Sequence, residues 1–385
     1  MANRLVTPFN VMTTFFFRRS VEKAFQLDEQ PSDLSLDPGK ETISQPPYIS
    51  SSVDDVMYIV NQTVERSLVT SDRAVIASAI PSIARVLDSD FIGMVQRKMR
   101  DESYPKAAIQ GALPPEQTII TFLVLINNLD VATDYVKRIV QSRVDGASRA
   151  EHSESTKRSS SSSIANLFPF DHDAQFVNNI LRSLQHSFES KTSELISDGT
   201  YVVFKNVVKP RLRPIIADSF RDVDYRMTAR ELEQISKEAE IEDGDNELIE
   251  LAVQRHFQRG WDALTKPLAR ILTAPGFERL LTTIISYLSE VLEKRVWSYY
   301  GRLNDLGAVR LERDIASIVS TVVRGGKYGF RDSFARCTQI CLIMNMEEDE
   351  WDELQATAGR AGGDGVEWRI DGEERIRARA MVRDN

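Results

Sequence analysis

Apolar residues recur at helical spacing along most of this 385-residue chain, and this pattern constrains its fold more than any other feature. The clearest case is the stretch from 51 to 68, whose large apolar residues are three or four positions apart. They are Val53, Val56, Met57, Val60, Val64 and Leu68. Residues at this spacing share one face of an α-helix, and that face must lie against neighbouring helices. Because no segment shows a convincing strand alternation, the sequence predicts an all-α fold.

Changes in composition divide the predicted helices into two bundles. We expect a leading helix over 1–27, a first bundle over 51–224 and a C-terminal bundle over 247–385. A linker is expected at 28–50, which carries four of the fourteen prolines, and an acidic linker at 225–246. The first linker lacks the apolar periodicity that would dock it, so we expect it to be flexible.

Two further features concern the first bundle. Residues 146–166 hold eight serines in 21 positions, too few apolar groups to offset chain entropy, so we expect a disordered insert there. We also expect the leading helix to start at Pro8, the helix over 72–100 to be kinked or broken near Pro81, and separate helices over 171–197 and 201–220.

The net charge of −9 is concentrated in one stretch, because nine acidic and two basic residues lie between Ala229 and Glu250. This balance does not resemble that of a nucleic-acid-binding protein. Two cysteines make no disulfide framework, which favours a reducing compartment. The longest uncharged apolar runs hold 13 and 12 residues, whereas a membrane-spanning helix needs about 20. Three arginines and no acidic residue in the first 21 positions leave a mitochondrial transit peptide open.

The sequence lacks the motifs of common enzymes and metal sites. Its four histidines, at 152, 172, 186 and 256, form no metal-ligand spacing. His172 lies between Asp171 and Asp173, which is more simply a helix start with acidic residues at its positive end. Neither a phosphate-binding glycine loop nor a GxSxG motif occurs. We therefore expect no enzyme activity, no cofactor and no metal.

The stretch FRDSFARCTQICLIMNME, residues 330–347, combines two cysteines with an arginine among apolar residues. Cys337 and Cys341 recur with Phe330, Phe334 and Met344 at spacings of three and four, which places them on one stripe of a helix over 331–344. A buried free cysteine behaves as a small hydrophobic residue. We therefore expect both to be buried structural thiols rather than metal ligands or a redox pair.

Arg336 in the same stretch projects beside Ile340 and Ile343, at the edge of the apolar face. A guanidinium there should be mostly buried and should need a carboxylate partner, ideally a bidentate one. Asp332, one turn earlier, is the local candidate, and the segment DGEER (371–375) offers others.

This stretch, followed by VEWRIDGEERIRA, resembles the C-terminal end of the family of subunit 4 of the conserved oligomeric Golgi complex. Four earlier stretches match in the same order: TTFFFRRSVEKAFQLDE, SSVDDVMYIV, FLVLINNLDV and RLNDLGAVRLERDIASIVS. The matches run from about Thr13 to Arg377 and are interrupted by the serine-rich insert. Each motif alone is weak, but six in the right order make the resemblance specific.

The resemblance implies an elongated rod of consecutive helical bundles, of the helical-rod tethering-complex type. It implies a non-catalytic Golgi vesicle-tethering subunit that acts in retrograde intra-Golgi transport. The implied partners are the other subunits of the complex and SNARE-type membrane-fusion proteins, with peripheral attachment at the cytosolic face of the Golgi membrane. It also implies a structural salt bridge between Arg336 and Glu374, six residues after Trp368.

Two departures from the family limit what the resemblance implies for this chain. Family members have a long N-terminal coiled-coil half, and this sequence starts where that half has ended, as expected for a fragment or a shortened gene model. Their basic C-terminal tail is replaced by RARAMVRDN. Two rival functions stay open: a helical adaptor or small-GTPase regulator in another trafficking pathway, because an all-α fold does not fix function, and an enzyme or mitochondrial protein.

Overall fold

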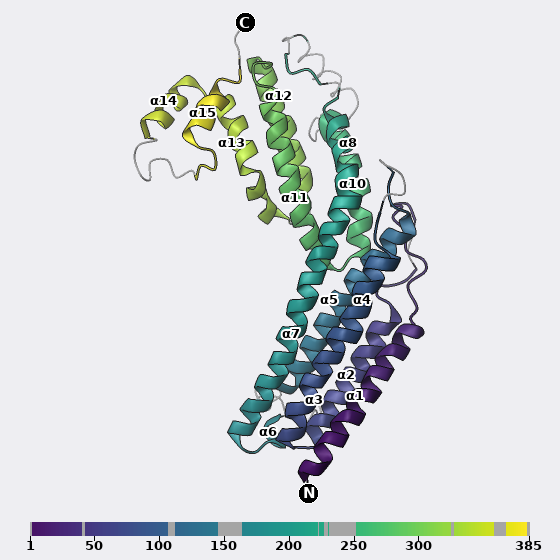
Figure 1. Cartoon of the computed structure of the whole chain (residues 1–385). Coiled ribbons are helices and arrows are strands. Elements are labelled where there is room, and N and C mark those ends of the chain that lie inside the picture. The colour runs from purple at the N-terminus through teal and green to yellow at the C-terminus, as the bar shows by residue number, and fades with distance from the viewer. Residues whose placement is uncertain are drawn as a thin grey trace, which may run out of the picture. The chain divides into compact units, whose positions relative to one another are not determined.

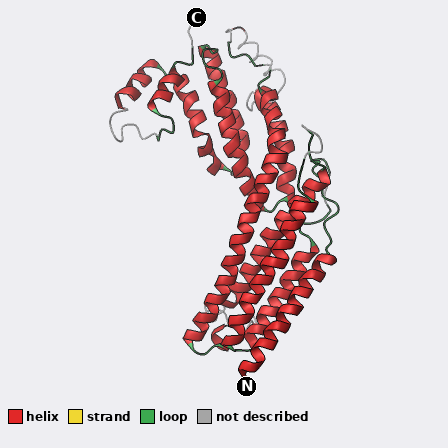
Figure 2. Ribbon diagram, viewed as in Figure 1, coloured by secondary structure: helices red, strands yellow, loops and turns green. Residues whose placement is uncertain are grey.

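The computed structural model (Figure 1) describes residues 2–40, 43–106, 112–144, 164–221, 223–226, 230, 252–324, 327–357 and 367–382. Within these ranges the secondary structure is helical, without strands, as Figure 2 shows in red. The all-α prediction is therefore confirmed. The chain divides into two compact units: unit 1 is Met1–Val207 with Lys266–Leu280, and unit 2 is Val208–Thr265 with Leu281–Asn385.

Unit 1 is a bundle whose long helices run side by side (Figure 1). Its helices are α1 (Ala2–Gln26), α2 (Ser51–Val69), α3 (Arg73–Val86), α4 (Gly93–Arg97), α5 (Glu116–Val144), α6 (Ile164–Leu167) and α7 (Asp171–Val203). π-Helical turns occupy Leu87–Ile92, Lys98–Glu102 and Phe204–Val208. α1 buries Phe17, Val21 and Ala24 in this bundle. The arginine-containing N-terminal stretch is thus an integral part of unit 1.

α5 is the central helix of unit 1. By length and composition alone it could cross a membrane, although its uncharged run is short. In unit 1, however, 67% of its most apolar window is buried. Ile119, Leu123, Ile126 and Leu129 are completely shielded from solvent. The apolar character of α5 is that of a core helix.

The helix breaks differ from those expected at prolines. Pro8 lies inside α1 and Pro81 inside α3. Each proline lacks the N–H group that would donate to the carbonyl group one turn earlier. Because both prolines are exposed, water can donate to those carbonyl groups instead. The regular α-helix instead changes to a π-helical turn at Leu87–Ile92. α7 runs without a break from Asp171 to Val203, so the expected interruption between 197 and 201 was wrong.

The described residues after α1, 27–40 and 43–50, contain no helix but are anchored to unit 1. The Lys98 ammonium donates to Asp28 over 2.7 Å. Glu116, at the start of α5, accepts hydrogen bonds from the Ser35 hydroxyl and the Leu36 amide. The structure therefore differs from the expected flexible linker, because polar contacts rather than an apolar stripe hold this segment in place.

Two buried asparagines of α5 complete this anchorage. The Asn127 amide donates to the carbonyl groups of Tyr48 and Ile271, over 2.9 and 2.7 Å, and its oxygen accepts from the amide of Thr273. Asn128 accepts from the Ser50 amide and donates to its hydroxyl, both over 2.9 Å. Asn127 thus ties two segments to α5: the one before α2, and the turn between α10 (Ala252–Ile271) and α11 (Ala274–Trp297).

Unit 2 contains the remaining helices, with parts of α10 and α11 assigned to unit 1. They are α8 (Lys209–Ser219), α10 (Ala252–Ile271), α11 (Ala274–Trp297), α12 (Asp305–Val323), α13 (Ala335–Met344), α14 (Glu348–Thr357) and α15 (Gly372–Arg379). A 3₁₀ turn, Tyr328–Phe334, precedes α13. Together α11, α12, α13 and α15 surround a core that includes Leu292, Leu311, Ile318 and Ile340.

The division between the units falls earlier than the composition indicated. α8 belongs to unit 2 because it packs closely on α10, where a Cβ on Gly260 would approach Ile215 to 2.7 Å. Most of the predicted acidic linker at 225–246 lies outside the described residues, although Tyr225 is buried in unit 2. The predicted serine-rich insert at 146–166 also lies outside them, except for its last three residues, which begin α6.

Candidate functional site

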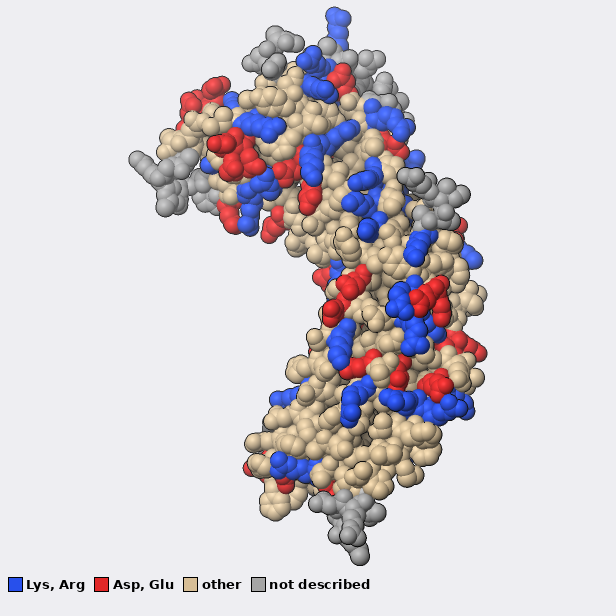
Figure 3. All heavy atoms as spheres, in the orientation of Figure 1, with Lys and Arg blue, Asp and Glu red and all other residues tan. Residues whose placement is uncertain are grey.

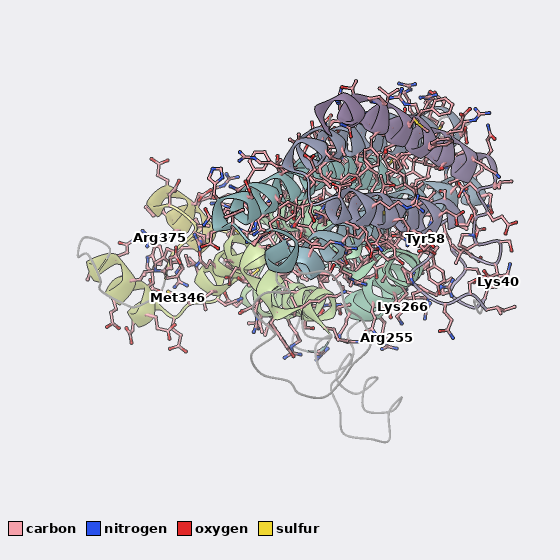
Figure 4. The ribbon with its side chains drawn as sticks, turned by 90° about the horizontal axis from the view of Figure 1, so that it is seen from below. Lys40, Tyr58, Arg255, Lys266, Met346 and Arg375 are labelled. Carbon is pink, nitrogen blue, oxygen red and sulfur yellow. The ribbon has the colours of Figure 1, made fainter. Side chains whose placement is uncertain are left out.

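α13 and the neighbouring ends of α11 and α15 form the candidate site, all within unit 2. The apolar face of α13 is buried, including Ile340 and Ile343, as the helical spacing predicts. Arg379 on α15 donates to the carbonyl group of Met346, just after α13. Figure 4 labels Met346 and, on α15, Arg375, which lies with its guanidinium 5.7 Å from the Trp368 ring. α15 is therefore fixed to the end of α13 at several points.

Arg336 sits between two carboxylates from different helices. Its Nε and Nη2 donate to the two oxygens of Glu293 on α11, over 3.0 and 2.8 Å. Nη2 also donates to Glu374 Oε1 on α15 over 2.6 Å, and Nη1 donates to Glu374 Oε2 over 3.3 Å. The backbone carbonyl of Arg369 accepts from Nη1 over 2.9 Å. The guanidinium thereby joins α13 to both α11 and α15 with its planar fork.

Glu374 has a second role at the start of α15. Asp371 and Glu374 form a capping box: the Glu374 amide donates to Asp371 Oδ1, and the Asp371 amide donates to Glu374 Oε2. Hydrogen bonds from Arg336 and then from the Asp371 backbone lower the pKa of Glu374. Hydrogen bonds to Glu293 and Glu374 in turn raise the pKa of Arg336. Glu374 and Arg336 therefore both stay charged at neutral pH.

The predicted site differs from the structure in two respects. The Arg336 side chain is 40% exposed rather than mostly buried, because it leaves the edge of α13 where the helix ends meet solvent. The local candidate, Asp332, is not among its contacts, and Glu293 is an additional partner. Glu293 could not be found from the sequence, since nothing distinguishes it from Glu290 one turn earlier on α11.

Removing Arg336 should destabilise unit 2 modestly. Arg336→Trp leaves two half-buried carboxylates facing each other, and we expect it to lower the free energy of unfolding by about 2 kcal/mol. This is less than the roughly 3–5 kcal/mol typical of a fully buried pair, because solvent screens the exposed part of the guanidinium.

Urea unfolding of a double-mutant cycle between positions 336 and 374 measures the coupling, which should be about 1 kcal/mol. Arg331→Trp is the matched control, since Arg331 is exposed five residues earlier and should change stability little. A coupling near zero would mean that the pairing with Glu374 contributes nothing.

Cys337 and Cys341 lie on the buried face of α13, each 1% exposed, and both are free thiols. A hydrogen bond with Cys337, together with burial, raises the pKa of Cys341 well above its usual range. Such a thiol is a poor nucleophile and a poor metal ligand. Among the described residues, no group of three or more His, Cys, Asp or Glu side chains could hold a metal ion.

Both thiols should therefore be structural. We expect Cys337→Ala and Cys341→Ala to cost about 1 kcal/mol each. Ellman's reagent should modify the folded protein slowly and the urea-unfolded protein at once. Stoichiometric zinc that is lost in the double variant would contradict this assignment.

A second polar cluster in unit 2 surrounds Asp314 on α12. Its side chain is completely buried, and the Tyr225 hydroxyl donates to its Oδ2 over 2.8 Å. Arg310 Nε lies 3.9 Å from the same oxygen. The burial of Asp314 could have been predicted from the sequence, because it falls among Leu311, Ile315 and Ile318 on the apolar face of its helix.

Asp314 should make the stability of unit 2 depend on pH. Burial raises its pKa to about 6, above the ordinary value of 3.8. The folded protein therefore binds this proton more tightly, so the stabilisation is complete below the unfolded pKa and is lost as the pH rises through about 6. Between pH 7.5 and pH 5 wild-type unit 2 should gain about 1–2 kcal/mol relative to Asp314→Asn. Chemical denaturation of both proteins at the two pH values checks this difference.

Two family models match the chain. The model described as "Conserved oligomeric Golgi complex subunit 4, C-terminal" matches residues 122–377, which include the Arg336 site. The model described as "COG4 transport protein, middle alpha-helical bundle" matches residues 1–99.

Curated relatives named conserved oligomeric Golgi complex subunit 4 match most of the chain. The Arabidopsis thaliana protein is 25% identical over 350 residues, covering 89% of this chain and 41% of the relative. The Saccharomyces cerevisiae protein is 23% identical over 270 residues, covering 68% and 30%, and the Homo sapiens protein 22% over 371 residues, covering 89% and 41%. The chain thus spans between 30% and 41% of the length of these relatives. Since the C-terminal family model alone matches more than half of it, this chain belongs to the family of conserved oligomeric Golgi complex subunit 4.

Proposed function

We propose that this chain is part of a multisubunit Golgi vesicle-tethering complex and acts in retrograde intra-Golgi transport through protein–protein contacts. The observation that carries the proposal is the match of two family models over residues 1–99 and 122–377. Within unit 2, the ion pairs of Arg336 link three helices, as a rigid docking element requires.

The partners proposed are the other subunits of the complex and SNARE-type membrane-fusion proteins. The chain would reach the cytosolic face of the Golgi membrane through these partners, as a peripheral protein. Its helix of membrane-crossing composition, α5, is largely buried in unit 1, which favours peripheral attachment over insertion. No enzyme activity is proposed.

Affinity purification of the tagged chain from its source cells tests this function. We expect the other large helical subunits of the complex to co-purify, and a Golgi pattern in microscopy of intact cells. High-salt or carbonate washes should release the chain from membranes without detergent. Recovery of a single small GTPase, or of mitochondrial matrix enzymes, would instead favour the rival functions.

A variant links this assay to the Arg336 site. Arg336→Trp should lower the cellular level of the chain and the amount of complex recovered with it, because unit 2 is less stable. Arg331→Trp, at an exposed neighbouring position, should leave both unchanged. If the same amount of complex were recovered with both variants, the Arg336 site would have no role in complex assembly.

A further inference from the structure

The N-terminal half of α1 exposes a row of large apolar side chains. Val11, Met12, Phe15 and Phe16 are 63%, 58%, 63% and 60% exposed. They are one, three, four or five positions apart, so they form one stripe on the outer face of the helix. Phe17 and Val21, on the opposite face, are buried in unit 1. A contiguous exposed apolar stripe of this kind is typical of an interaction surface.

This stripe borders a groove between α1 and α2, which we call the α1–α2 groove. Phe9, Met12 and Phe16 line it from α1, and Ile59, Thr63 and Arg66 line it from α2. Its volume is about 330 Å³, enough for one or two large apolar side chains. A groove between two helices that is lined by apolar side chains is a common docking site for an amphipathic helix.

Two arginines of α1 near the groove are paired with carboxylates, whereas Arg66 on the groove itself is not, within the described part of the chain. Arg18 pairs with Asp90 over 2.7 Å, and Arg19 pairs with Glu22 over 2.6 Å. Arg66 is exposed and has no acidic partner among the described residues. Figure 3 shows neutral surface over the N-terminal half of α1 and charged side chains further along unit 1. The groove therefore offers apolar area with a single cation at its rim.

We propose that the α1–α2 groove binds an amphipathic α-helix from the part of the subunit 4 family that this chain does not span. The matched regions of the family are described as middle and C-terminal, and the chain covers 41% of the Arabidopsis thaliana relative. The remaining length of the family therefore precedes the middle bundle, to which α1 and α2 belong. The inference rests on family membership and not on the proposed tethering function.

The chemistry of the groove defines the helix that it accepts. Apolar side chains at positions i, i+3 or i+4 and i+7 would contact Met12, Phe15 and Phe16. An acidic side chain near one end of that stripe would pair with Arg66. A lipid surface fits less well, since electrostatic attraction to anionic lipid needs several cations, and Arg66 is the one cation among the described residues that line the groove.

Binding of synthetic peptides to the purified full chain tests the proposal. Overlapping fluorescent peptides tile the part of the Arabidopsis thaliana relative that precedes its matched region, and fluorescence anisotropy gives each dissociation constant. We expect one or more amphipathic peptides with an acidic residue to bind. The double variant Phe15→Glu/Phe16→Glu should weaken that binding more than about tenfold, and Arg66→Glu about fivefold in low salt.

Tyr201→Glu is the control, because Tyr201 is 56% exposed on α7 of the same unit and does not line the groove. It should bind the peptide as the wild type does, and thermal melts should show that every variant is folded. Absence of peptide binding, or binding that the double variant leaves unchanged, would overturn the proposal. Two other results would also overturn the proposal if no peptide bound. They are binding to phosphatidylserine vesicles, or self-association of the chain, that the double variant abolishes. A negative result here would leave co-purification with the Golgi complex unaffected, so the two proposals can fail separately.

Discussion

Asn127→Leu should lower the free energy of unfolding of unit 1 by about 3–5 kcal/mol, although leucine has nearly the same size as asparagine. The substitution removes three hydrogen bonds from a completely buried side chain. It leaves the carbonyl groups of Tyr48 and Ile271 and the amide of Thr273 without their partner. Each buried polar group that loses its partner costs about 1–3 kcal/mol, and the apolar leucine offsets only part of this loss.

Urea denaturation of the full chain measures the change, and hydrogen exchange shows where it acts. The amides near Tyr48 and Thr273 should lose protection first, since Asn127 holds both segments. Gln141→Leu, an exposed amide on the same helix, is the matched control and should stay within about 0.5 kcal/mol of the wild type. A loss below about 1 kcal/mol for Asn127→Leu would show that water replaces these hydrogen bonds.

Gly307→Ala should have a comparable effect on unit 2. Gly307 lies in the first turn of α12, where the Asn304 side chain caps the helix by accepting from the Gly307 amide over 3.0 Å. A Cβ at this position would lie 1.6 Å from the carbonyl oxygen of Tyr225. Because the obstacle is backbone, it cannot rotate aside as a side chain would. The start of α12 must then separate from Tyr225, at a cost of about 3 kcal/mol or more.

Thermal unfolding followed by circular dichroism should show this loss in the transition of unit 2. Gly329→Ala is the control, because a Cβ there would meet no described atom within 4 Å apart from those of its chain neighbours. It should change the midpoint by a few degrees at most. If Gly307→Ala melted like the control, the close approach of Tyr225 to α12 would be refuted.

The sequence predicted those parts of the fold that depend on one helix at a time. Helical spacing located α2 within a residue of its observed bounds, and it placed Cys337 and Cys341 on a buried face. The anchorage of residues 27–50 could not be predicted, because it depends on Asn127, Asn128 and Glu116, polar residues of a distant helix. Apolar periodicity carries no information about such contacts.

The candidate site shows the same limit. Position on the helix indicated that Arg336 needs a carboxylate, and the family resemblance indicated Glu374. The second partner, Glu293, depends on how α11 is rotated against α13, which the packing of the whole unit determines. The exposure of Arg336 also depends on where neighbouring helices end. These are tertiary properties that the local sequence does not encode.

The double role of Glu374 has a consequence for how the end of the chain folds. An eight-residue helix is too short to persist alone, because nucleating its first turn is unfavourable. The carboxylate that caps this first turn of α15 is also the one that Arg336 holds. Capping and docking of the first turn of α15 are therefore coupled, because one carboxylate serves both. When the Arg336 contact opens, α15 should fray from this first turn, while its other end stays held by buried Met381, whose carbonyl group accepts from the Gly301 amide.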